Sequence, residues 1–287
     1  MRATTKLRKL LATGETHLVP GAYDGMSARI VQAAGAEIVY ATGGGIARST
    51  GIPDMGMLNP FQIEDRLTQM VDAVEIPIIG DFDTGYGNVL NALHELKRFE
   101  RTGIAGFHIE DQTFPKRCGH LDNKTVVPVE ELVTKIRAIK DNQLDPDFVV
   151  IARTDSLAIE GVNSAIERMH KYMEAGADVA FVEAPTSLDE LKKISGEFKD
   201  VPLLYNMFWS GKSPVLEKKA LEELGFNLMI APGDLQRAAM HTMKLMAEEI
   251  LKVGHTEKYM DMMASFQDRE EAVNTPHYMQ LDDKYSD

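Results

Sequence analysis

The segment IPIIGDFD (76–83) decides the fold, because a short apolar run passes directly into two carboxylates. AGFHIED (105–111) and FVVIARTD (148–155) repeat this design further along the chain. Short apolar runs that do not alternate with polar residues are typical of strands buried on both faces, as in parallel sheets. We therefore predict three buried parallel strands, each ending in charged residues.

Similar apolar runs extend this pattern toward both ends of the chain. They are HLVPGAY (17–23), EIVYATG (37–43), DVAFVEAP (178–185), VPLLYN (201–206) and NLMIAP (227–232). Between the runs, apolar residues recur at helical spacing, for example over 129–139 and 162–173. Gly35, Gly176 and Gly225 follow predicted helices, where a helix C-terminus favours a residue that tolerates positive φ. Strands that alternate with helices indicate parallel pairing.

Eight strand–helix units predict an α/β fold, a (β/α)₈ TIM-type barrel that forms a single domain over residues 1–287. A doubly wound open sheet of eight strands is the structural alternative. From about residue 255 the chain continues as an appended C-terminal helix and tail. At the other end, residues 1–15 are basic but lack the continuous apolar stretch of a targeting segment. We interpret them instead as a short amphipathic helix.

The composition is that of a soluble globular protein, with 44% hydrophobic and 26% charged residues. The 44 acidic residues outnumber the 31 basic ones, and the resulting net charge of −13 argues against a nucleic-acid partner. The apolar runs are too short to span a bilayer, so we expect no membrane partner. The single cysteine excludes an internal disulfide and fits the reducing cytoplasm, where we expect the protein to act.

Polar residues collect where the predicted strands end, which is the edge that carries the active site of a (β/α)₈ barrel. These residues are Tyr40, Thr42, Gly43, Gly44, Asp81, Asp83, Glu110, Asp111, Arg153, Asp155, Glu183 and Asn206. Acidic residues at strand ends also cap helices, and Asp111 and Asp155 fit that role alone. Capping does not explain the pair Asp81 and Asp83, which lie two residues apart on one strand face.

Asp81, Asp83 and Glu110 would repel one another at neighbouring strand ends unless a cation lies among them. Oxygen ligands of this kind favour Mg²⁺, with Mn²⁺ as a substitute. Neither an EF-hand loop nor a dinucleotide-binding glycine motif fits the neighbouring residues. The carboxylates therefore predict a divalent-metal site.

The segment KRCGH (116–120) places a thiol beside two cations and an imidazole. These neighbours predict a lowered pKa for the Cys118 thiol and ready proton exchange. A cysteine nucleophile in an acyl-transfer enzyme is a competing interpretation, and a buried inert cysteine is another. The predicted metal site argues against an acyl-transfer nucleophile, and the charged neighbours argue against a buried inert cysteine.

Taken together, these segments resemble the isocitrate lyase/phosphoenolpyruvate mutase superfamily. The matching motifs are PGAYDGMSARI (20–30), TGGG (42–45), GIPDMG (51–56), DFDTGYGN (81–88), HIEDQ (108–112), KRCGH (116–120), IARTD (151–155), the strand ending at Glu183, and YNM (205–207). They follow one another over nearly the whole chain. KRCGH indicates the lyase branch, and the short chain is similar to 2-methylisocitrate lyases.

The resemblance implies a role for each matching residue. Mg²⁺ is implied to be held, partly through water, by Asp54, Asp81, Asp83 and Glu110. A small anionic carboxylate substrate is implied to contact Thr42, Gly43, Gly44, Lys116, Arg117, Gly119, Arg153, Glu183 and Asn206. Cys118 is implied to be the catalytic acid, with His120 and Arg153 in the same catalytic set.

These residues suit the cleavage of a 2-hydroxy di- or tricarboxylic acid into a 2-oxo acid and a carboxylic acid. Mg²⁺ would lower the pKa of the substrate hydroxyl. Cleavage leaves an enediolate that Cys118 protonates. The charge of the enediolate can be balanced by Lys116, Arg117, His120 and Arg153. Tyr40 is the candidate acceptor of the hydroxyl proton, and its alternative role is that of a packed strand aromatic.

The chain departs from the 2-methylisocitrate lyase pattern beside the substrate, because Phe208-Trp209 stands where those enzymes carry a polar Thr-Glu pair. This change favours a smaller or more apolar acid, such as 2,3-dimethylmalate. Oxaloacetate hydrolysis and phosphonate chemistry on the same site are alternatives, although Pro232 replaces a serine typical of the hydrolases. A third interpretation is a barrel that binds a carboxylate without catalysis. Unpaired carboxylates cost free energy, and a barrel without catalysis has no reason to keep them.

The last part of the chain is rich in methionine, with Met240, Met243 and Met246 in one predicted helix. Such flexible apolar surface requires cover. The resemblance implies that this helix is exchanged between subunits of a homotetramer built as a dimer of dimers.

Overall fold

Eight strands alternate with helices in the computed structural model, which describes residues 1–117, 119, 123–209 and 211–286. The strands are β1 His17–Ala22, β2 Val39–Ala41, β3 Ile78–Asp81, β4 Gly106–Glu110, β5 Val149–Thr154, β6 Val179–Val182, β7 Leu204–Asn206 and β8 Leu228–Ala231. Each lies inside one of the predicted apolar runs, so the strand predictions are confirmed.

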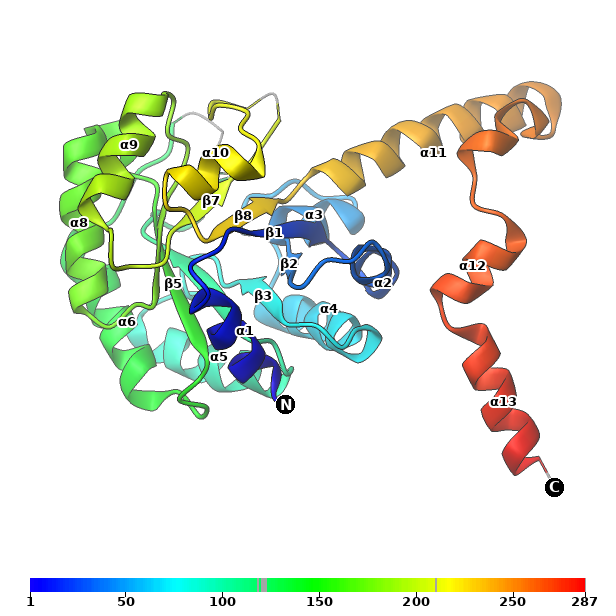
Figure 1. Cartoon of the computed structure of the whole chain (residues 1–287), viewed down its shortest axis with the longest axis horizontal. Coiled ribbons are helices and arrows are strands. Elements are labelled where there is room, and N and C mark those ends of the chain that lie inside the picture. Colours follow the sequence, from blue (N-terminus) through cyan, green and yellow to red (C-terminus); the bar gives the residue numbers. More distant parts are fainter. Residues whose placement is uncertain (118, 120–122, 210, 287) are drawn as a thin grey trace. The chain divides into compact units, whose positions relative to one another are not determined.

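The strands form one parallel sheet in the order β6-β5-β4-β3-β2-β1-β8-β7. Ala180 of β6 and Leu203, beside β7, form a parallel bridge between the two ends of this order. The sheet therefore curls into a nearly closed barrel with helices outside it (Figure 1). The predicted TIM-type fold is confirmed, and the doubly wound sheet is excluded.

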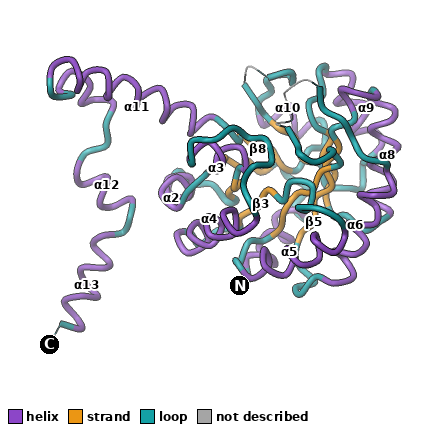
Figure 2. Tube along the Cα trace, turned by 180° about the vertical axis from the view of Figure 1, so that it is seen from behind, coloured by secondary structure: helices purple, strands orange, loops and turns teal. Residues whose placement is uncertain are grey.

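Helices follow the strands and cover the outside of the barrel (Figure 2). They are α2 Gly25–Ala33, α3 Gly43–Ser49, α4 Pro60–Ala73, α5 Val89–Arg101, α6 Val129–Asn142, α7 Leu157–Glu160, α8 Val162–Glu174, α9 Leu188–Glu197 and α10 Lys218–Glu223. One further helix, α1 Ala3–Leu11, precedes β1. The periodic segments 129–139 and 162–173 are α6 and α8. Gly35, Gly176 and Gly225 have φ of 92°, 106° and 85°, as their positions after helices require.

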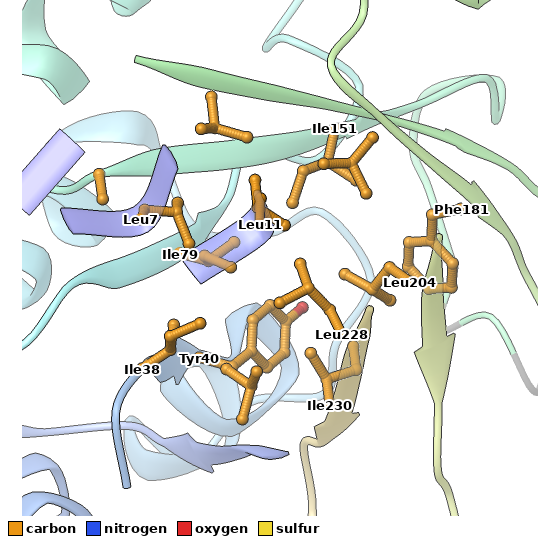
Figure 3. Close-up of a cluster of buried hydrophobic side chains, with 14 residues drawn as sticks. Leu7, Leu11, Ile38, Tyr40, Ile79, Ile151, Phe181, Leu204, Leu228 and Ile230 are labelled. Atoms are coloured by element: carbon orange, nitrogen blue, oxygen red, sulfur yellow. The ribbon is translucent and has the colours of Figure 1, made fainter. Parts of the chain in front are cut away.

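The interior of the barrel changes character along the strands. Its lower part, toward the N-terminal ends of the strands, is an apolar cluster to which Ile79, Ile151 and Phe181 contribute, and Leu7 and Leu11 of α1 belong to the same cluster (Figure 3). The predicted N-terminal helix is therefore the floor of the barrel. Because side chains two positions apart on a strand share a face, the residue two places after each strand member of this group points into the upper part of the barrel. Those residues are Asp81, Arg153 and Glu183.

The chain divides into two compact units, Met1–Gly233 and Asp234–Asp287. The second unit consists of α11 Asp234–Val253, the 3₁₀ helix η1 Glu257–Met262, α12 Phe266–Ala272 and α13 Thr275–Tyr285. It carries exposed apolar side chains, among them Met240, Met243 and Leu251. The single-domain description with an extension from about residue 255 stays a prediction. Among the described residues, no helix is both long and apolar enough to cross a membrane.

Candidate active site

The strand register brings the predicted polar residues together at the upper end of the barrel. Asp81 of β3 lies beside His108 of β4, and Glu110 of β4 lies beside Arg153 of β5. All four side chains are buried. Charged groups thus stand side by side in a part of the molecule that water reaches poorly, which strengthens every electrostatic interaction among them.

The turn after β3 fixes two of the predicted metal ligands. The Asp83 N–H donates to Asp81 Oδ1 over 3.0 Å, and the Glu110 N–H donates to the Asp83 carbonyl over 3.0 Å. Asp83 has φ of 46°, a left-handed conformation that is uncommon for a residue with a Cβ. Such strain persists only where the surroundings impose it, and it concentrates at functional sites.

Lys116 lies among the carboxylates. Its Nζ is 2.6 Å from Asp54 Oδ1 and 2.8 Å from Asp83 Oδ1, and the residue is 4% exposed. Burial alone would lower the pKa of Lys116, but four nearby carboxylates raise it well above its ordinary value. These carboxylates are Asp83, Asp81, Asp54 and Glu110, the four predicted metal ligands. They therefore create a strong binding position for positive charge.

Glycines allow two of these carboxylates to approach the backbone after β2. A Cβ on Gly43 would lie 2.4 Å from Asp81 Oδ2, and one on Gly44 would lie 2.9 Å from Asp54 Oδ2. Any other residue would push the carboxylates away. The preceding Thr42 is buried, and its Oγ1 accepts the Gly45 N–H over 3.2 Å, which caps α3.

Arg153 is the centre of a second group of charges. Its Nε and Nη2 donate to Asp155 Oδ2 and Oδ1 over 2.9 and 3.1 Å. Its Nη1 lies 3.1 Å from Glu110 Oε2, and its Nη2 lies 3.5 Å from Glu183 Oε2. Asn206 Nδ2 donates to both oxygens of Glu183 over 3.2 Å. One edge of the guanidinium is thus fixed by Asp155, while the other faces the site.

Asp111 and Asp155 do not act as simple helix caps, so that interpretation is wrong. Asp155 pairs with Arg153 and also with Lys124, whose Nζ is 2.7 Å from Asp155 Oδ1. Asp111 accepts bonds from the Asp155 N–H and the Tyr172 hydroxyl over 2.9 Å each. Strand-exit position alone did not reveal Lys124 and Tyr172 as partners, because Lys124 comes from a loop and Tyr172 from α8.

Tyr40 and His108 form a buried pair that the sequence did not predict. The Tyr40 hydroxyl is 2.7 Å from His108 Nε2, which is 3.6 Å from Asp81 Oδ1. Burial and the Asp81 charge raise the pKa of Tyr40 well above its ordinary value, so the phenol keeps its proton. Burial, with Arg153 and Lys116, lowers the pKa of His108 to about 3, so the imidazole is neutral. His108 could have been found from its position two residues before Glu110 on the same strand face.

The remaining predicted residues belong to the loop after β4. Arg117 is tied to Gln112, whose Oε1 accepts the Arg117 N–H over 2.9 Å. Gly119 is buried against Arg153. Cys118 and His120 lie outside the described residues. Among the residues that are described, no three His, Cys, Asp or Glu side chains form a ready-made metal cluster.

A family model described as phosphoenolpyruvate phosphomutase matches residues 7–251 of the chain. The chain belongs to the PEP mutase/isocitrate lyase superfamily. Within this superfamily, it is 34% identical over 287 residues to 2,3-dimethylmalate lyase of Eubacterium barkeri, covering 100% of this chain and 99% of that relative. It is 40% identical over 234 residues to 2-methylisocitrate lyase of Bacillus subtilis (strain 168), covering 82% and 77% of the two chains.

Solved structures of superfamily members share the whole fold. A structure of 2,3-dimethylmalate lyase aligns with a TM-score of 0.93 at 33% identity, covering 99% of this chain and 95% of that one. Oxaloacetate acetylhydrolase with 3,3-difluorooxalacetate aligns with a TM-score of 0.93 at 31% identity, covering 99% and 97%. Phosphonopyruvate hydrolase in complex with oxalate and Mg²⁺ aligns with a TM-score of 0.91 at 25% identity, covering all of both chains. The superfamily therefore places several reactions on one barrel.

Proposed function

We propose that this protein is an Mg²⁺-dependent carbon–carbon lyase that acts in the cytoplasm on a 2-hydroxy di- or tricarboxylic acid. The products would be a 2-oxo acid such as pyruvate and a second carboxylic acid. The observation that carries the proposal is the group of four carboxylates around Lys116, together with Arg153 at the same end of the barrel. The two lyase relatives support the same reaction class.

The residues present fit a divalent ion. In the described part of the site, neither oxygen of Glu110 accepts a hydrogen bond, although Arg153 Nη1 lies 3.1 Å from Oε2. Both oxygens of this buried carboxylate thus keep acceptor capacity that a bound cation beside Arg153 would use. A cavity of about 10 Å³, roughly the volume that holds one water molecule, is bordered by Asp54, Asp81 and Asp83. These three residues and Glu110 would hold the ion, with Mn²⁺ as a substitute.

The chemistry that bound Mg²⁺ would supply is polarisation of the substrate's hydroxyl and carboxylate oxygens, which lowers the pKa of the hydroxyl. Arg153 and Lys116 would balance the charge that develops when the carbon–carbon bond breaks. Tyr40 would accept the hydroxyl proton, for which its own phenol must first lose its proton against the raised pKa of that group. Cys118 would then protonate the carbanion.

The substrate side chain would be read near β7. Phe208-Trp209 lies just after Asn206, the last residue of β7, and Trp209 is 59% exposed. An apolar pair at this point favours a methyl-substituted dicarboxylic acid, such as 2,3-dimethylmalate, over an acid with a third carboxylate. Oxaloacetate hydrolysis is the second candidate, because the structural likeness extends to oxaloacetate acetylhydrolase.

A substrate panel tests this proposal. 2,3-Dimethylmalate, 2-methylisocitrate and oxaloacetate are each incubated with the protein and Mg²⁺, and pyruvate, propionate, succinate and oxalate are quantified. We expect pyruvate, at a rate that vanishes on exhaustive chelation and returns with Mg²⁺ or Mn²⁺. Full turnover after chelation would refute the metal-dependent mechanism, and oxalate as the main product would establish hydrolysis instead.

We also propose that the protein is a homotetramer in which helices are exchanged between subunits. Every residue of β2 to β7 is buried, whereas β1 and β8 contain residues that are not, such as Leu18, which is 46% exposed. An outer strand face of this kind requires a covering helix. We propose that α11 of another subunit is this covering helix, because it carries exposed methionines.

Light scattering at micromolar concentration is expected to give the mass of a tetramer. Met243→Glu should shift the mass downward, because it places a charge on the apolar face of α11. Lys244→Glu is a matched control in the same helix, at a residue whose side chain is 75% exposed. A monomeric wild-type protein would contradict the proposal.

A further inference from the structure

Lys124 connects the loop after β4 to the end of β5. Its side chain is buried, and its Nζ donates both to the Gly119 carbonyl and, over 2.7 Å, to Asp155 Oδ1. Gly119 belongs to KRCGH, whereas Asp155 follows the strand that carries Arg153. One ammonium group thus joins the loop after β4 to Asp155, which is 31 residues away from Lys124 in the sequence.

Asp155 is a rigid attachment point. Asp111 Oδ1 accepts its backbone N–H over 2.9 Å, and Asp111 Oδ2 accepts the Thr154 hydroxyl over 2.7 Å. The Asp155 side chain also binds Arg153 through two hydrogen bonds of 2.9 and 3.1 Å. Both its backbone and its carboxylate are therefore fixed without Lys124.

Gly119 lies directly against the ion pair of Arg153 and Glu183. A Cβ on Gly119 would be 2.5 Å from Arg153 Nη2 and 2.8 Å from Glu183 Cδ. The loop can approach this closely only because residue 119 has no side chain. The Gly119 carbonyl is consequently held where residue 119 lies against Arg153 and Glu183.

We propose that Lys124 is a positioning residue, which holds the KRCGH loop against Arg153 by binding the Gly119 carbonyl and Asp155 together. This inference rests on the proposed function, because the loop carries the predicted acid Cys118. Lys124 contacts no predicted metal ligand, and its partners are a carbonyl and a carboxylate that already has a cation. Its specific contribution is therefore the placement of the loop rather than the balance of charge.

The expected effect is on turnover more than on substrate affinity. In Lys124→Met the Arg153–Asp155 pair stays charge-balanced, so the protein should fold and bind substrate. The loop loses its connection to β5, and a displacement of about 1 Å in a reacting group can cost about 10²-fold in rate. We expect kcat to fall by about that factor and KM to change much less.

Lys140→Met is the matched control. Lys140 also forms a lysine–aspartate pair, with Nζ 3.0 Å from Asp178 Oδ2, but Asp178 precedes β6 at the floor end of the barrel. This variant should leave kcat and KM as in the wild type. A general effect of losing a buried or half-buried ion pair would appear in both variants.

Hydrogen exchange in the ligand-free protein tests the placement without any activity. Three amides report on the loop: Thr113 donates to the Thr125 carbonyl over 2.9 Å, Val127 donates to the Asp111 carbonyl over 2.8 Å, and Arg117 donates to Gln112. Lys124→Met should accelerate exchange in peptides covering 113–117 and 123–127 and leave peptides outside the loop after β4 unchanged. Lys140→Met should not accelerate exchange there.

Chemical rescue gives an independent readout. Lys124→Ala should regain turnover when n-propylammonium is added, because the small cation can occupy the vacated position, whereas tetramethylammonium, which cannot donate a hydrogen bond, should have no effect. Wild-type kcat in Lys124→Met, or exchange that is unchanged or raised uniformly, would overturn the inference. A wild-type protein that cleaves no 2-hydroxy acid would refute the proposed function, while the exchange experiment would still decide the role of Lys124.

Discussion

Replacing Cys118 by serine is expected to lower kcat by about 10²–10⁴-fold, the usual contribution of a positioned acid. A serine hydroxyl keeps the size and hydrogen bonding of the side chain, but its far higher pKa makes it a poor proton donor to a carbanion. Substrate affinity should survive, because the metal ligands and Arg153 hold the substrate. The expected signature is a collapsed kcat with a nearly unchanged Kd.

The same variant separates a catalytic cysteine from a structural one. A packed cysteine replaced by serine would cost stability and leave kcat almost intact. Turnover, oxalate affinity and thermal unfolding should therefore be measured on one preparation. Near-normal turnover would remove Cys118 from the mechanism.

Replacing Arg153 by methionine is expected to be the most destabilising single change in the site. Arg153 is 8% exposed and faces Asp155, Glu110 and Glu183. Without the guanidinium Glu110 and Glu183 lose the cation beside them, while Asp155 keeps only Lys124. Breaking a buried pair in this way costs about 3–5 kcal/mol. Denaturant unfolding should show the loss, and oxalate binding should weaken strongly.

Two further variants show whether the effect is specific. Arg153→Lys restores a charge but not the two parallel bonds to Asp155, so stability should recover only in part and oxalate binding should stay weak. Arg98 forms a similar pair with Glu64, at 2.6 and 2.7 Å, on the outside of the barrel. Arg98→Met should lower stability less and leave oxalate binding unchanged. Equal effects at both arginines would contradict a special role for Arg153.

The sequence was sufficient to predict the strands, because period and polarity are local properties. The apolar runs ending in Asp81, Glu110 and Arg153 were each recognisable within about eight residues. Parallel pairing then followed from the alternation of strands with helices. The predicted gathering of these side chains at one end of a barrel is a direct consequence, since parallel strands end at the same edge.

The pairing of charges within the site could not be predicted in this way. Lys116 and Lys124 reach their carboxylates from a loop, and a loop's path depends on packing against several strands at once. The Tyr40–His108 pair joins two strands whose register the sequence does not specify. Asp155 was interpreted as a helix cap because acidic residues at strand ends commonly cap the following helix, and its pairing with Arg153 and Lys124 is not visible from that position alone.

The apolar floor formed by α1 and the lower strand residues separates two tasks within single strands. Ile79 and Ile151 maintain the packing, while Asp81 and Arg153, two residues further on, face the opening of the barrel. Such a strand can therefore carry a charged residue at its outer end without loosening the packing at its inner end. The same architecture is kept in relatives at 25–33% identity that bear the names of a lyase and two hydrolases.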